Sequence, residues 1–234
     1  MSTPNEQDRL KQAAADWSAD QLRDGMIVGL GSGSTAAMAV NAIGKRVKEG
    51  LRIIGIPTSE HTAEQARGLG IPLATLGEYQ EIDIAIDGAD EVELGTLNLI
   101  KGGGGNQLRE KIVAAASKHF LVIVDQSKLV KRLGEKEKVP VEVAQFGWQA
   151  TARVLEKLSG HPGLRKEPSG EPFITDGGNY ILDCAFGPIS SPAELQEELD
   201  SVAGVLEHGL FIGMAGQVAI GAPEGVRLLS RHSR

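Results

Sequence analysis

Two aspartates, a lysine and a glutamate stand close together in the middle of the chain. Residues 82–110 read IDIAIDGADEVELGTLNLIKGGGGNQLRE, so that Asp87, Asp90, Lys101 and Glu110 fall within one short stretch. A carboxylate can serve as a general base, and a lysine can stabilise the oxyanion that forms when a proton is removed. These residue types suit proton transfer on a polar substrate.

The two aspartates follow an apolar strand pattern, with Asp90 three residues after Asp87. Ligands of open α/β sheets bind beyond the carboxyl ends of the strands, which is where Asp87 falls. Gly88 lets the backbone turn sharply at this point. Two close carboxylates repel, so one of them could hold a proton and pass it between hydroxyl groups. A turn held by aspartate side chains is the alternative, and it explains this stretch better when the stretch is taken alone.

The glycine run Gly102–Gly105 favours a ligand-binding loop. Each glycine adds to the entropy lost on folding, and a packing reason for four in a row is hard to find. Such a run allows successive N–H groups to wrap around a polar ligand. Asn106 can cap the helix that follows, and Glu110 lies about one turn into it, where the helix dipole favours its ionised form. From spacing alone, a surface glutamate paired with a helix neighbour explains Glu110 equally well.

A second glycine-rich segment, GLGSGST at Gly29–Thr35, follows a short apolar run and opens a helical pattern. The first N–H groups of a helix suit a phosphate or a carboxylate. The segment lacks the third glycine of the dinucleotide-binding fingerprint, because Ser34 stands there, and it lacks the lysine of the P-loop. Ser34 or Thr35 can serve as the helix N-cap. A tight strand–helix turn without a ligand is the alternative.

Other candidate residues are scattered along the chain. Lys128 follows an apolar run and Lys11 lies in the first predicted helix, and either could meet a phosphate or face water. The five histidines show no metal-ligand spacing. The single cysteine, Cys184, can build neither a disulfide framework nor a cysteine metal site. We therefore expect no metal and no cofactor.

The composition is that of an ordinary globular protein. A chain of 234 residues allows one large domain or two small ones, and 41% hydrophobic residues can bury a core. The net charge of −7 argues against nucleic acid or an anionic membrane as the main partner. No apolar run approaches the length of a membrane span, and the N-terminus lacks the apolar region of a signal peptide. We therefore expect a cytoplasmic protein.

Alternating strand and helix patterns must position these residues. Short apolar runs predict buried strands at Met26–Leu30, 51–57, Ile82–Ile86 and 120–125. Helical spacing predicts helices at Asp8–Ser18, from Ser34 or Thr35 onward, at Thr58–Leu69 and at Gln107–His119. This alternation predicts a mostly parallel sheet with helices on both faces.

The pattern changes after about Leu133. A strand, a helix, two strands joined by a turn at Asp176–Gly178, a helix and a strand predict a ferredoxin-like β-α-β-β-α-β unit. The second of these helices has strong start signals, with Ser191 as N-cap, Pro192 at its first position and Glu194 completing a capping box.

Two domains follow from these patterns. We expect a Rossmann-like α/β domain at residues 1–133 and 209–234, because the last strand patterns return to the first sheet. A smaller ferredoxin-like α+β domain would occupy residues 134–208. The first domain would then be discontinuous, with the smaller one inserted into it.

The ordered set GLGSGST, IDGADE, IKGGGG…LREKI, VDQSK and VPVEV closely resembles ribose-5-phosphate isomerase of the A type. The similarity runs from LKQAAADW to VAIGAPEGV, and the combination is specific although each motif alone is not. The resemblance implies a metal-free interconversion of ribose 5-phosphate and ribulose 5-phosphate through an enediolate, in the non-oxidative pentose phosphate pathway. It also implies a Rossmann-like domain with a ferredoxin-like one, and a homodimer or homotetramer.

The resemblance implies a role for each candidate residue. Glu110 would be the base that carries a proton between C2 and C1. Asp87 would help ring opening and proton movement among the oxygens, Lys101 would stabilise the enediolate, and Asp90 would line the pocket. The substrate would be held by residues that match the family's binding positions: Lys11, Ser32, Gly33, Ser34, Thr35, Asp87, Gly88, Ala89, Asp90, Lys101, Gly102, Gly103, Gly104 and Lys128.

The chain departs from the family pattern at three places. Ser32 stands where threonine is frequent, the glycine loop reads GGGGNQ, and Gly216 stands where an aspartate is usual, which could alter the sheet edge or subunit contacts. The alternatives are a non-catalytic sugar-phosphate sensor, a CoA-transferase, or another sugar-phosphate isomerase on a similar fold. The presence of Glu110, Asp87 and Lys101 favours catalysis over a sensor.

Overall fold

The computed structural model describes residues 4–231, which form two compact units. The first unit takes Met1–Ala89, Arg109–Lys128 and Met214–Arg234, and the second takes Asp90–Leu108 and Leu129–Gly213. The chain therefore passes between the units four times. The sequence patterns predict an uninterrupted first domain as far as residue 133, whereas the second compact unit also contains residues 90–108.

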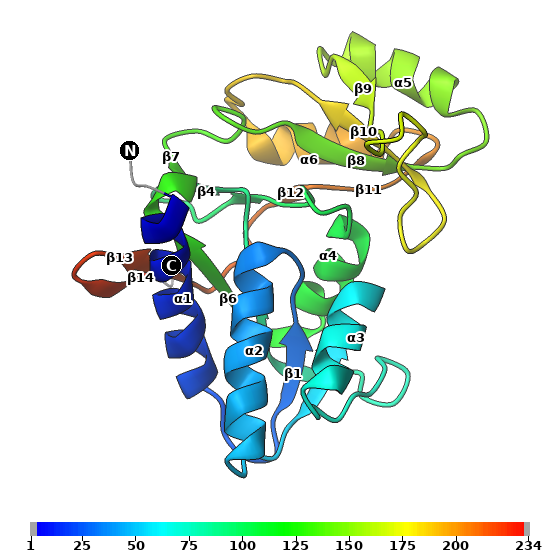
Figure 1. Cartoon of the computed structure of the whole chain (residues 1–234). Coiled ribbons are helices and arrows are strands. Elements are labelled where there is room, and N and C mark those ends of the chain that lie inside the picture. Colours follow the sequence, from blue (N-terminus) through cyan, green and yellow to red (C-terminus); the bar gives the residue numbers. More distant parts are fainter. Residues whose placement is uncertain (1–3, 232–234) are drawn as a thin grey trace. The chain divides into compact units, whose positions relative to one another are not determined.

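The first unit is built on a six-stranded sheet (Figure 1). Its strands are β1 (Ile27–Leu30), β2 (Ile54–Pro57), β3 (Ile82–Asp87), β6 (Ser117–Asp125), β13 (Gln217–Ala222) and β14 (Gly225–Ser230). Its helices are α1 (Pro4–Asp20), α2 (Ser34–Lys48), α3 (Glu60–Gly68), α4 (Gln107–Ala115, which begins in the second unit) and the 3₁₀ turn η1 (Gln126–Lys128). The strand order is β14-β13-β6-β3-β1-β2, and all neighbours are parallel except β13 and β14.

This strand order has a switch point between β1 and β3. From β1 the chain runs through α2 to β2 on one side, and it then returns through α3 to β3 on the other side. Ligands of doubly wound sheets bind outside the carboxyl ends of the strands at such a point. The loop after β1 and Asp87 at the end of β3 both lie there.

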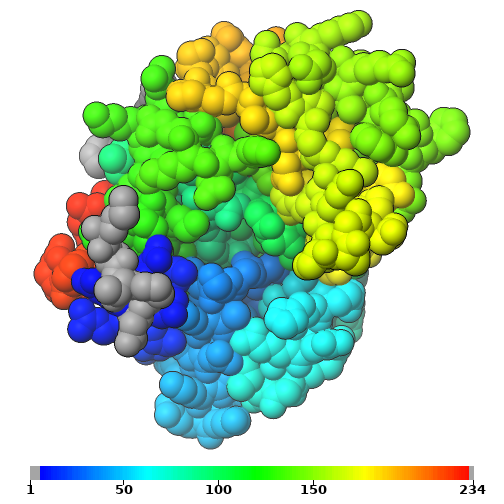
Figure 2. Space-filling model, turned by 45° about the horizontal axis from the view of Figure 1, so that its top comes forward, coloured from blue at the N-terminus to red at the C-terminus, as the bar shows by residue number. Residues whose placement is uncertain are grey.

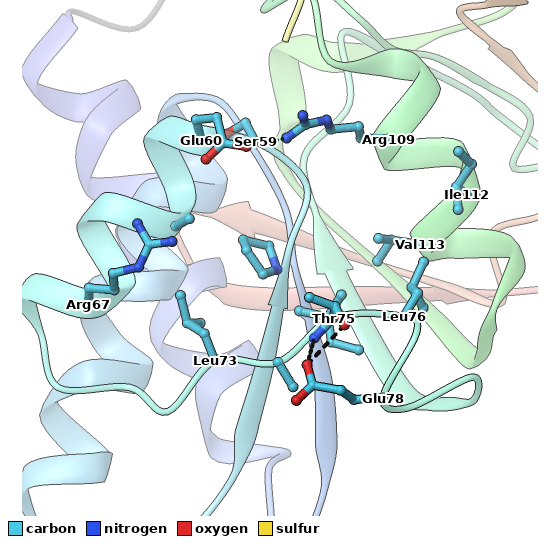
Figure 3. Close-up of a pocket in the computed structure, with 14 residues that line it drawn as sticks. Ser59, Glu60, Arg67, Leu73, Thr75, Leu76, Glu78, Arg109, Ile112 and Val113 are labelled. Carbon is cyan, nitrogen blue, oxygen red and sulfur yellow. Dashed lines mark hydrogen bonds and ion pairs between the residues drawn. The ribbon is translucent and has the colours of Figure 1, made fainter. Parts of the chain in front are cut away.

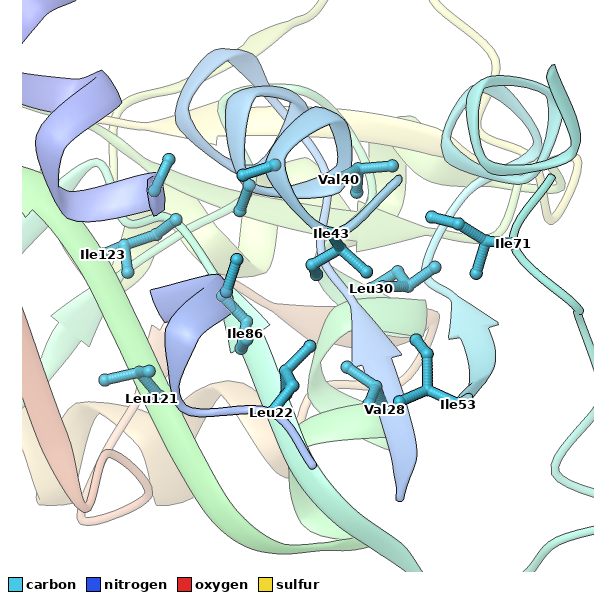
Figure 4. Close-up of a cluster of buried hydrophobic side chains, with 14 of the residues drawn as sticks. Leu22, Val28, Leu30, Val40, Ile43, Ile53, Ile71, Ile86, Leu121 and Ile123 are labelled. Atoms are coloured by element: carbon cyan, nitrogen blue, oxygen red, sulfur yellow. The ribbon is translucent and has the colours of Figure 1, made fainter. Parts of the chain in front are cut away.

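Helices cover both faces of β1. Val28 and Leu30 pack with Val40 and Ile43 of α2 in a buried cluster (Figure 4). A side chain at Gly29 would point to the opposite face, where an added Cβ would lie 2.6 Å from Val113 of α4. Because side chains alternate along a strand, α2 and α4 lie on opposite faces of the sheet. The predicted mostly parallel sheet with helices on both faces is confirmed.

The second unit contains two four-stranded sheets. The larger has the order β11-β8-β10-β9, is antiparallel throughout and carries two helices. In chain order its elements are β8 (Val139–Val143), α5 (Trp148–Lys157), β9 (Pro162–Leu164), β10 (Tyr180–Cys184), α6 (Pro192–Asp200) and β11 (Val205–His208). The predicted β-α-β-β-α-β unit is therefore confirmed. The smaller sheet, which the patterns did not predict, has the order β12 (Leu210–Phe211), β5 (Leu99–Ile100), β4 (Glu91–Glu93) and β7 (Leu129–Val130).

A buried glutamate explains why residues 90–108 join the second unit. The carboxylate of Glu91 in β4 accepts the backbone N–H groups of Gly134 at 2.6 Å, Lys136 at 2.6 Å and Glu137 at 2.9 Å. Buried carboxylates are stable only when they are hydrogen-bonded, and these three donors satisfy this one. Such long-range pairing leaves no periodic signal in the sequence.

Several helix ends differ from the predictions. The N-cap of α2 is Gly33, not Ser34 or Thr35. Ser191 is the N-cap of α6, with Pro192 following, but its side chain makes no cap hydrogen bond, so the predicted capping box is not formed. The helix α4 ends at Ala115, four residues before the predicted end, because β6 already begins at Ser117.

Two further predictions concern the surface. The predicted turn at Asp176–Gly178 is confirmed, with the N–H of Gly178 bonded to the carbonyl of Thr175 at 2.8 Å. It belongs to the segment between β9 and β10, much of which is exposed (yellow in Figure 2). Among the described helices, none is long and apolar enough to cross a membrane.

Candidate active site

The loop after β1 is fastened to the end of β3. The Asp87 carboxylate is only 2% exposed, and its Oδ1 accepts the N–H of Ser32 at 3.1 Å and that of Gly88 at 2.7 Å. Gly31 lies so close that an added Cβ would overlap this carboxylate and lie 2.6 Å from the Asp87 Cα. A glycine is therefore required at position 31, and the loop and Asp87 form one rigid arrangement.

The N-terminus of α2 is open to an anion. Gly33 has φ of 92°, in the region that favours glycine, and no side chain caps the helix. The first turn holds no acidic residue, and Gly33 and Ser34 are exposed. Among the described residues, no acceptor meets the N–H groups of Gly33, Ser34 and Thr35. Free N–H groups and the helix dipole favour a phosphate or carboxylate here.

The hydroxyl of Ser32 points into a group of three other hydroxyls. Its Oγ lies 2.6 Å from Thr58 Oγ1, 3.0 Å from Ser59 Oγ and 3.3 Å from Thr62 Oγ1. These three residues are not among the predicted site residues. Their signal is TSEHT directly after β2, because β2 is the neighbour of β1 and its carboxyl end meets the same edge of the sheet.

The two candidate lysines come from elements that are joined in the first unit. Lys128 ends η1, whose start is fixed by Asp125, because Oδ1 of that buried side chain accepts the N–H of Ser127 at 2.8 Å. The amide of Gln7 in α1 donates to Ser127 Oγ at 3.0 Å, and Lys11 follows one turn later on the same helix. No carboxylate among the described residues pairs with Lys128. Both lysines thus belong to one region, where α1 meets η1.

The glycine loop of the second unit has packing reasons that the sequence did not reveal. Gly102 has φ of 99°, and an added Cβ would lie 2.7 Å from Gln107 Oε1. Gly105 has φ of 81°, and an added Cβ would lie 2.5 Å from the ring of Phe173. Gly104 alone has space around it. The expectation that packing could not explain the run is therefore wrong for most of its length.

Side chains of the second unit also occupy the polar groups of this loop. The N–H of Gly103 donates to Asp90 Oδ2 at 2.8 Å. Arg165 donates to the carbonyls of Gly102 at 2.9 Å and Gly103 at 3.0 Å, and its Nε donates to Asp183 Oδ2 at 3.0 Å. Neither Arg165 nor Asp183 was predicted, because nothing near them in the sequence points to the loop.

The proposed base and the proposed oxyanion partner are both buried. Glu110 on α4 is 4% exposed, so the alternative of a surface glutamate is wrong. Lys101 in the second unit is 3% exposed, and its Nζ lies 5.5 Å from the centroid of the Phe211 ring, a cation–π contact. Lys, Glu and Asp are rarely buried without a functional or structural partner, and burial of this kind is frequent at active sites.

A pocket of about 560 Å³ lies in the first unit (Figure 3). It is bordered by the end of β2, by α3, by the stretch from Leu73 to Glu78 and by α4. An ion pair of 2.9 Å joins Arg109 to Glu60 at its edge. Ile112, which is 47% exposed, and Val113 contribute apolar surface. None of the predicted site residues lines it, although Ser59 of the hydroxyl group does.

Three residues of the second unit have ligand atoms close enough to share a metal ion, namely Asp200, Glu207 and His208. The Nδ1 atom of His208 accepts the N–H of Leu210 at 3.1 Å, so the ring proton sits on Nε2. That nitrogen donates to Asp200 Oδ1 at 3.1 Å. A metal would need the lone pair of Nε2, so the geometry favours a buried hydrogen bond here.

Comparisons with known proteins agree on one family. The model of the family described as ribose 5-phosphate isomerase A (phosphoriboisomerase A) matches residues 54–225. A protein of Synechococcus sp. (strain JA-3-3Ab) named ribose-5-phosphate isomerase A is 56% identical over 223 residues, which cover 95% of this chain and 97% of that protein. A protein of the same name from Gluconobacter oxydans is 54% identical and covers 92% and 94%.

Solved structures give the same result. The structure of ribose 5-phosphate isomerase A from Methanocaldococcus jannaschii superposes with a TM-score of 0.91 at 43% identity, covering 95% of this chain and 98% of that one. A D-ribose-5-phosphate isomerase in complex with phospho-erythronic acid superposes with a TM-score of 0.93 at 38% identity, covering 96% and 99%.

Proposed function

The chain belongs to the ribose 5-phosphate isomerase A family, and from this premise we propose which of its residues carry out the reaction. The chain is an aldose–ketose isomerase that interconverts D-ribose 5-phosphate and D-ribulose 5-phosphate. Such a reaction needs a base for a C–H proton, groups that stabilise an enediolate and an anchor for the phosphate.

Glu110 is the base. It removes the proton from C2 of the open-chain aldose, and the electron pair of that bond moves toward C1, so that the carbonyl oxygen becomes an oxyanion. The same carboxyl then returns a proton to C1, while a proton moves between the two oxygens, and the ketose results. The burial of Glu110 is the observation that carries this assignment, because it keeps bulk water away from the carboxylate that takes the proton.

Lys101 and Asp87 act on the oxygens of the sugar. The buried ammonium of Lys101 offsets the charge of the enediolate, where a low local dielectric strengthens the interaction. Asp87 takes part in ring opening and in proton movement between the oxygens, and the two N–H groups on its Oδ1 hold its carboxylate in one orientation. No metal or cofactor is required for these steps.

The phosphate binds at the N-terminus of α2. The support is the set of free N–H groups at Gly33, Ser34 and Thr35, together with the cations Lys11 and Lys128. The rest of the substrate is held by Gly88, Ala89, Asp90, Gly102, Gly103 and Gly104, and Ser32 supports the loop that holds the phosphate. Binding energy from the remote phosphate can then be used to orient the sugar over the base.

The variant Glu110→Gln tests the base. We expect it to fold normally and to lose about 10²–10⁴-fold in kcat, the usual contribution of a positioned base. The matched control is Glu142→Gln, which changes another buried glutamate that only accepts hydrogen bonds from Thr175 and Asn179. Near-normal turnover of ribose 5-phosphate by Glu110→Gln would refute the assignment.

EDTA should leave the wild-type rate unchanged, and a loss restored by a divalent metal would contradict the metal-free mechanism.

A panel of sugar phosphates separates the alternatives. Formation of ribulose 5-phosphate from ribose 5-phosphate, measured beside other pentose and tetrose phosphates, distinguishes this activity from that of a sensor or a different isomerase.

We also propose that the protein works in the cytoplasm as a homodimer or homotetramer without nucleic acid or membrane partners. Light scattering of the purified protein would measure the size of the assembly.

A further inference from the structure

The hydroxyl of Ser32 and the three hydroxyls around it form a closed set of hydrogen bonds. Thr58 Oγ1 donates to the carbonyl of Leu30 at 3.1 Å, and Thr62 Oγ1 donates to the carbonyl of Gly31 at 3.0 Å. Ser59 Oγ donates to Thr62 Oγ1 at 3.0 Å and accepts the N–H of Thr62 at 3.0 Å, as the N-cap of α3. Each of these three residues is at most 4% exposed.

A count of hydrogens shows where the hydroxyl of Ser32 points. A hydroxyl has one hydrogen to donate, and those of Thr58, Thr62 and Ser59 are already used. The hydrogen of Ser32 then goes to Thr58 Oγ1 at 2.6 Å or to Ser59 Oγ at 3.0 Å. Its backbone N–H is also used, on Asp87. Neither donor of Ser32 is therefore directed at a ligand.

The same contacts fix the backbone just before the anion site. The carbonyl of Leu30 accepts both the N–H of Thr58, at 2.9 Å, and the hydroxyl of Thr58. The N–H of Gly31 donates to the carbonyl of Ile86 at 2.9 Å. The next peptide unit is fixed at both ends, by Thr62 on the Gly31 carbonyl and by Asp87 on the Ser32 N–H. The first unfixed N–H group along the chain is that of Gly33.

We propose that Thr58, Ser59 and Thr62 are positioning residues for the substrate phosphate. They hold Ser32 and the carbonyls of Leu30 and Gly31 inward, so that the N–H groups from Gly33 onward face the anion. This inference rests on the proposed function and adds three residues of α3 and its N-terminus to the binding machinery. Ser32 acts with them from behind the loop and does not donate to the phosphate.

A double-mutant cycle between Ser32→Ala and Thr62→Val tests the proposal. In each single variant the Kd for phospho-erythronic acid and the KM for ribose 5-phosphate should rise about tenfold, because a buried carbonyl or hydroxyl loses its partner. The value of kcat should change less than about twofold, because the base is untouched. The double variant should be little worse than either single variant, since both changes disrupt one set of contacts.

Three further proteins complete the test. Thr62→Ser keeps the hydroxyl and should restore the Kd. Thr151→Val removes a similar buried bond, from Thr151 Oγ1 to the carbonyl of Ala203 at 3.1 Å in the second unit, and should lower stability without changing the Kd. Thr58→Val replaces Thr62→Val in the cycle if the latter does not fold.

Two results would overturn the proposal. One is an unchanged Kd in the valine variants, and the other is full additivity of Ser32→Ala with Thr62→Val, which would mean that Ser32 meets the phosphate by itself. The proposed function fails separately, if the wild-type protein does not isomerise ribose 5-phosphate at all. Wild-type isomerase activity with unaffected valine variants would refute only the positioning role.

Discussion

The two glycine-rich loops of the molecule use glycine for different purposes. In the first unit, Gly31 allows the loop to approach Asp87, and the N–H groups from Gly33 onward are left without acceptors among the described residues. In the second unit, Gly102, Gly103 and Gly105 meet close neighbours, and several polar groups of the run are used by the protein. The N–H of Gly103 bonds Asp90, and that of Gly105 bonds the carbonyl of Gly102 at 2.9 Å.

This difference shows that the number of glycines does not measure the capacity of a loop to bind ligands. The shorter pattern keeps free donors because a helix begins there, and the first N–H groups of a helix have no partner within it. In the longer run, the N–H groups of Gly103 and Gly105 are bonded within the protein, and Arg165 donates to the carbonyls of Gly102 and Gly103. We expect the first loop to supply backbone donors to an anion and the second to supply shape and the side chain of Lys101.

Of the changes that separate the two loops, Gly31→Ala should have the largest effect. The new Cβ would overlap the Asp87 carboxylate, so either the loop or Asp87 must move. Overpacking of this kind costs about 1–3 kcal/mol of folding free energy, and a displacement of about 1 Å can cost 10²-fold in rate. Thermal unfolding and kcat/KM measure the two effects. The control Gly68→Ala has open space at the end of α3, so it should leave kcat/KM unchanged and raise stability by about 0.4–1 kcal/mol. Equal behaviour of the two variants would contradict the rigid link.

A smaller, purely structural effect should separate Gly105 from Gly104. Gly105→Ala places a Cβ at positive φ and against Phe173, so it should destabilise the protein by about 1–2 kcal/mol from backbone strain alone. Gly104→Ala has room and no positive φ, and it should stabilise by about 0.4–1 kcal/mol through the unfolded chain. Urea unfolding of both variants checks the sign, and destabilisation by Gly104→Ala would mean that the whole run is constrained.

Much of this arrangement was predictable from local patterns. The alternation of strands and helices gave the sheet, and Asp87 could be placed because it ends an apolar strand. The position of Glu110 in a helix could also be predicted, but its burial could not, because burial depends on packing partners that are distant in the sequence. The place of residues 90–108 in the second compact unit also depends on distant partners, since Glu91 joins β4 to residues more than forty positions later.

The supports of the loops were the least predictable part. Thr58, Ser59 and Thr62 meet Ser32 only because β1 and β2 are neighbours in the sheet. Arg165 reaches the glycine loop across more than sixty residues, and neither its type nor its surroundings mark it in a single sequence. Residues of this kind satisfy backbone groups, a task that any suitable donor or acceptor can perform, so they carry no motif.

Near neutral pH the two regions should behave alike, and away from it their stabilities should depend on pH in opposite directions. In the first unit, the N–H of Ile27 bonded to Asp83 lowers the pKa of this carboxyl below its usual 3.8. Its contribution to stability is present above that value and is lost as the pH falls below it. In the second unit, burial raises the pKa of the Cys184 thiol from 9.0 to about 12, and nearby Asp183 adds to the shift.

The sign for Cys184 is the reverse, because the fold favours the protonated thiol. Its contribution is complete below about pH 9 and is lost as the pH rises from there toward 12. The quantity to compare is the free energy of unfolding relative to its value at neutral pH. In alkali it should fall further for the wild-type protein than for Cys184→Ala. In acid it should fall further for the wild-type protein than for Asp83→Asn. Cys184 lies beside Asp183, whose carboxylate holds Arg165. In alkali, the protection of backbone amides against hydrogen exchange, relative to the intrinsic exchange rate, should therefore fall first around β10 and the second loop. A uniform loss of protection over both units would contradict the separation.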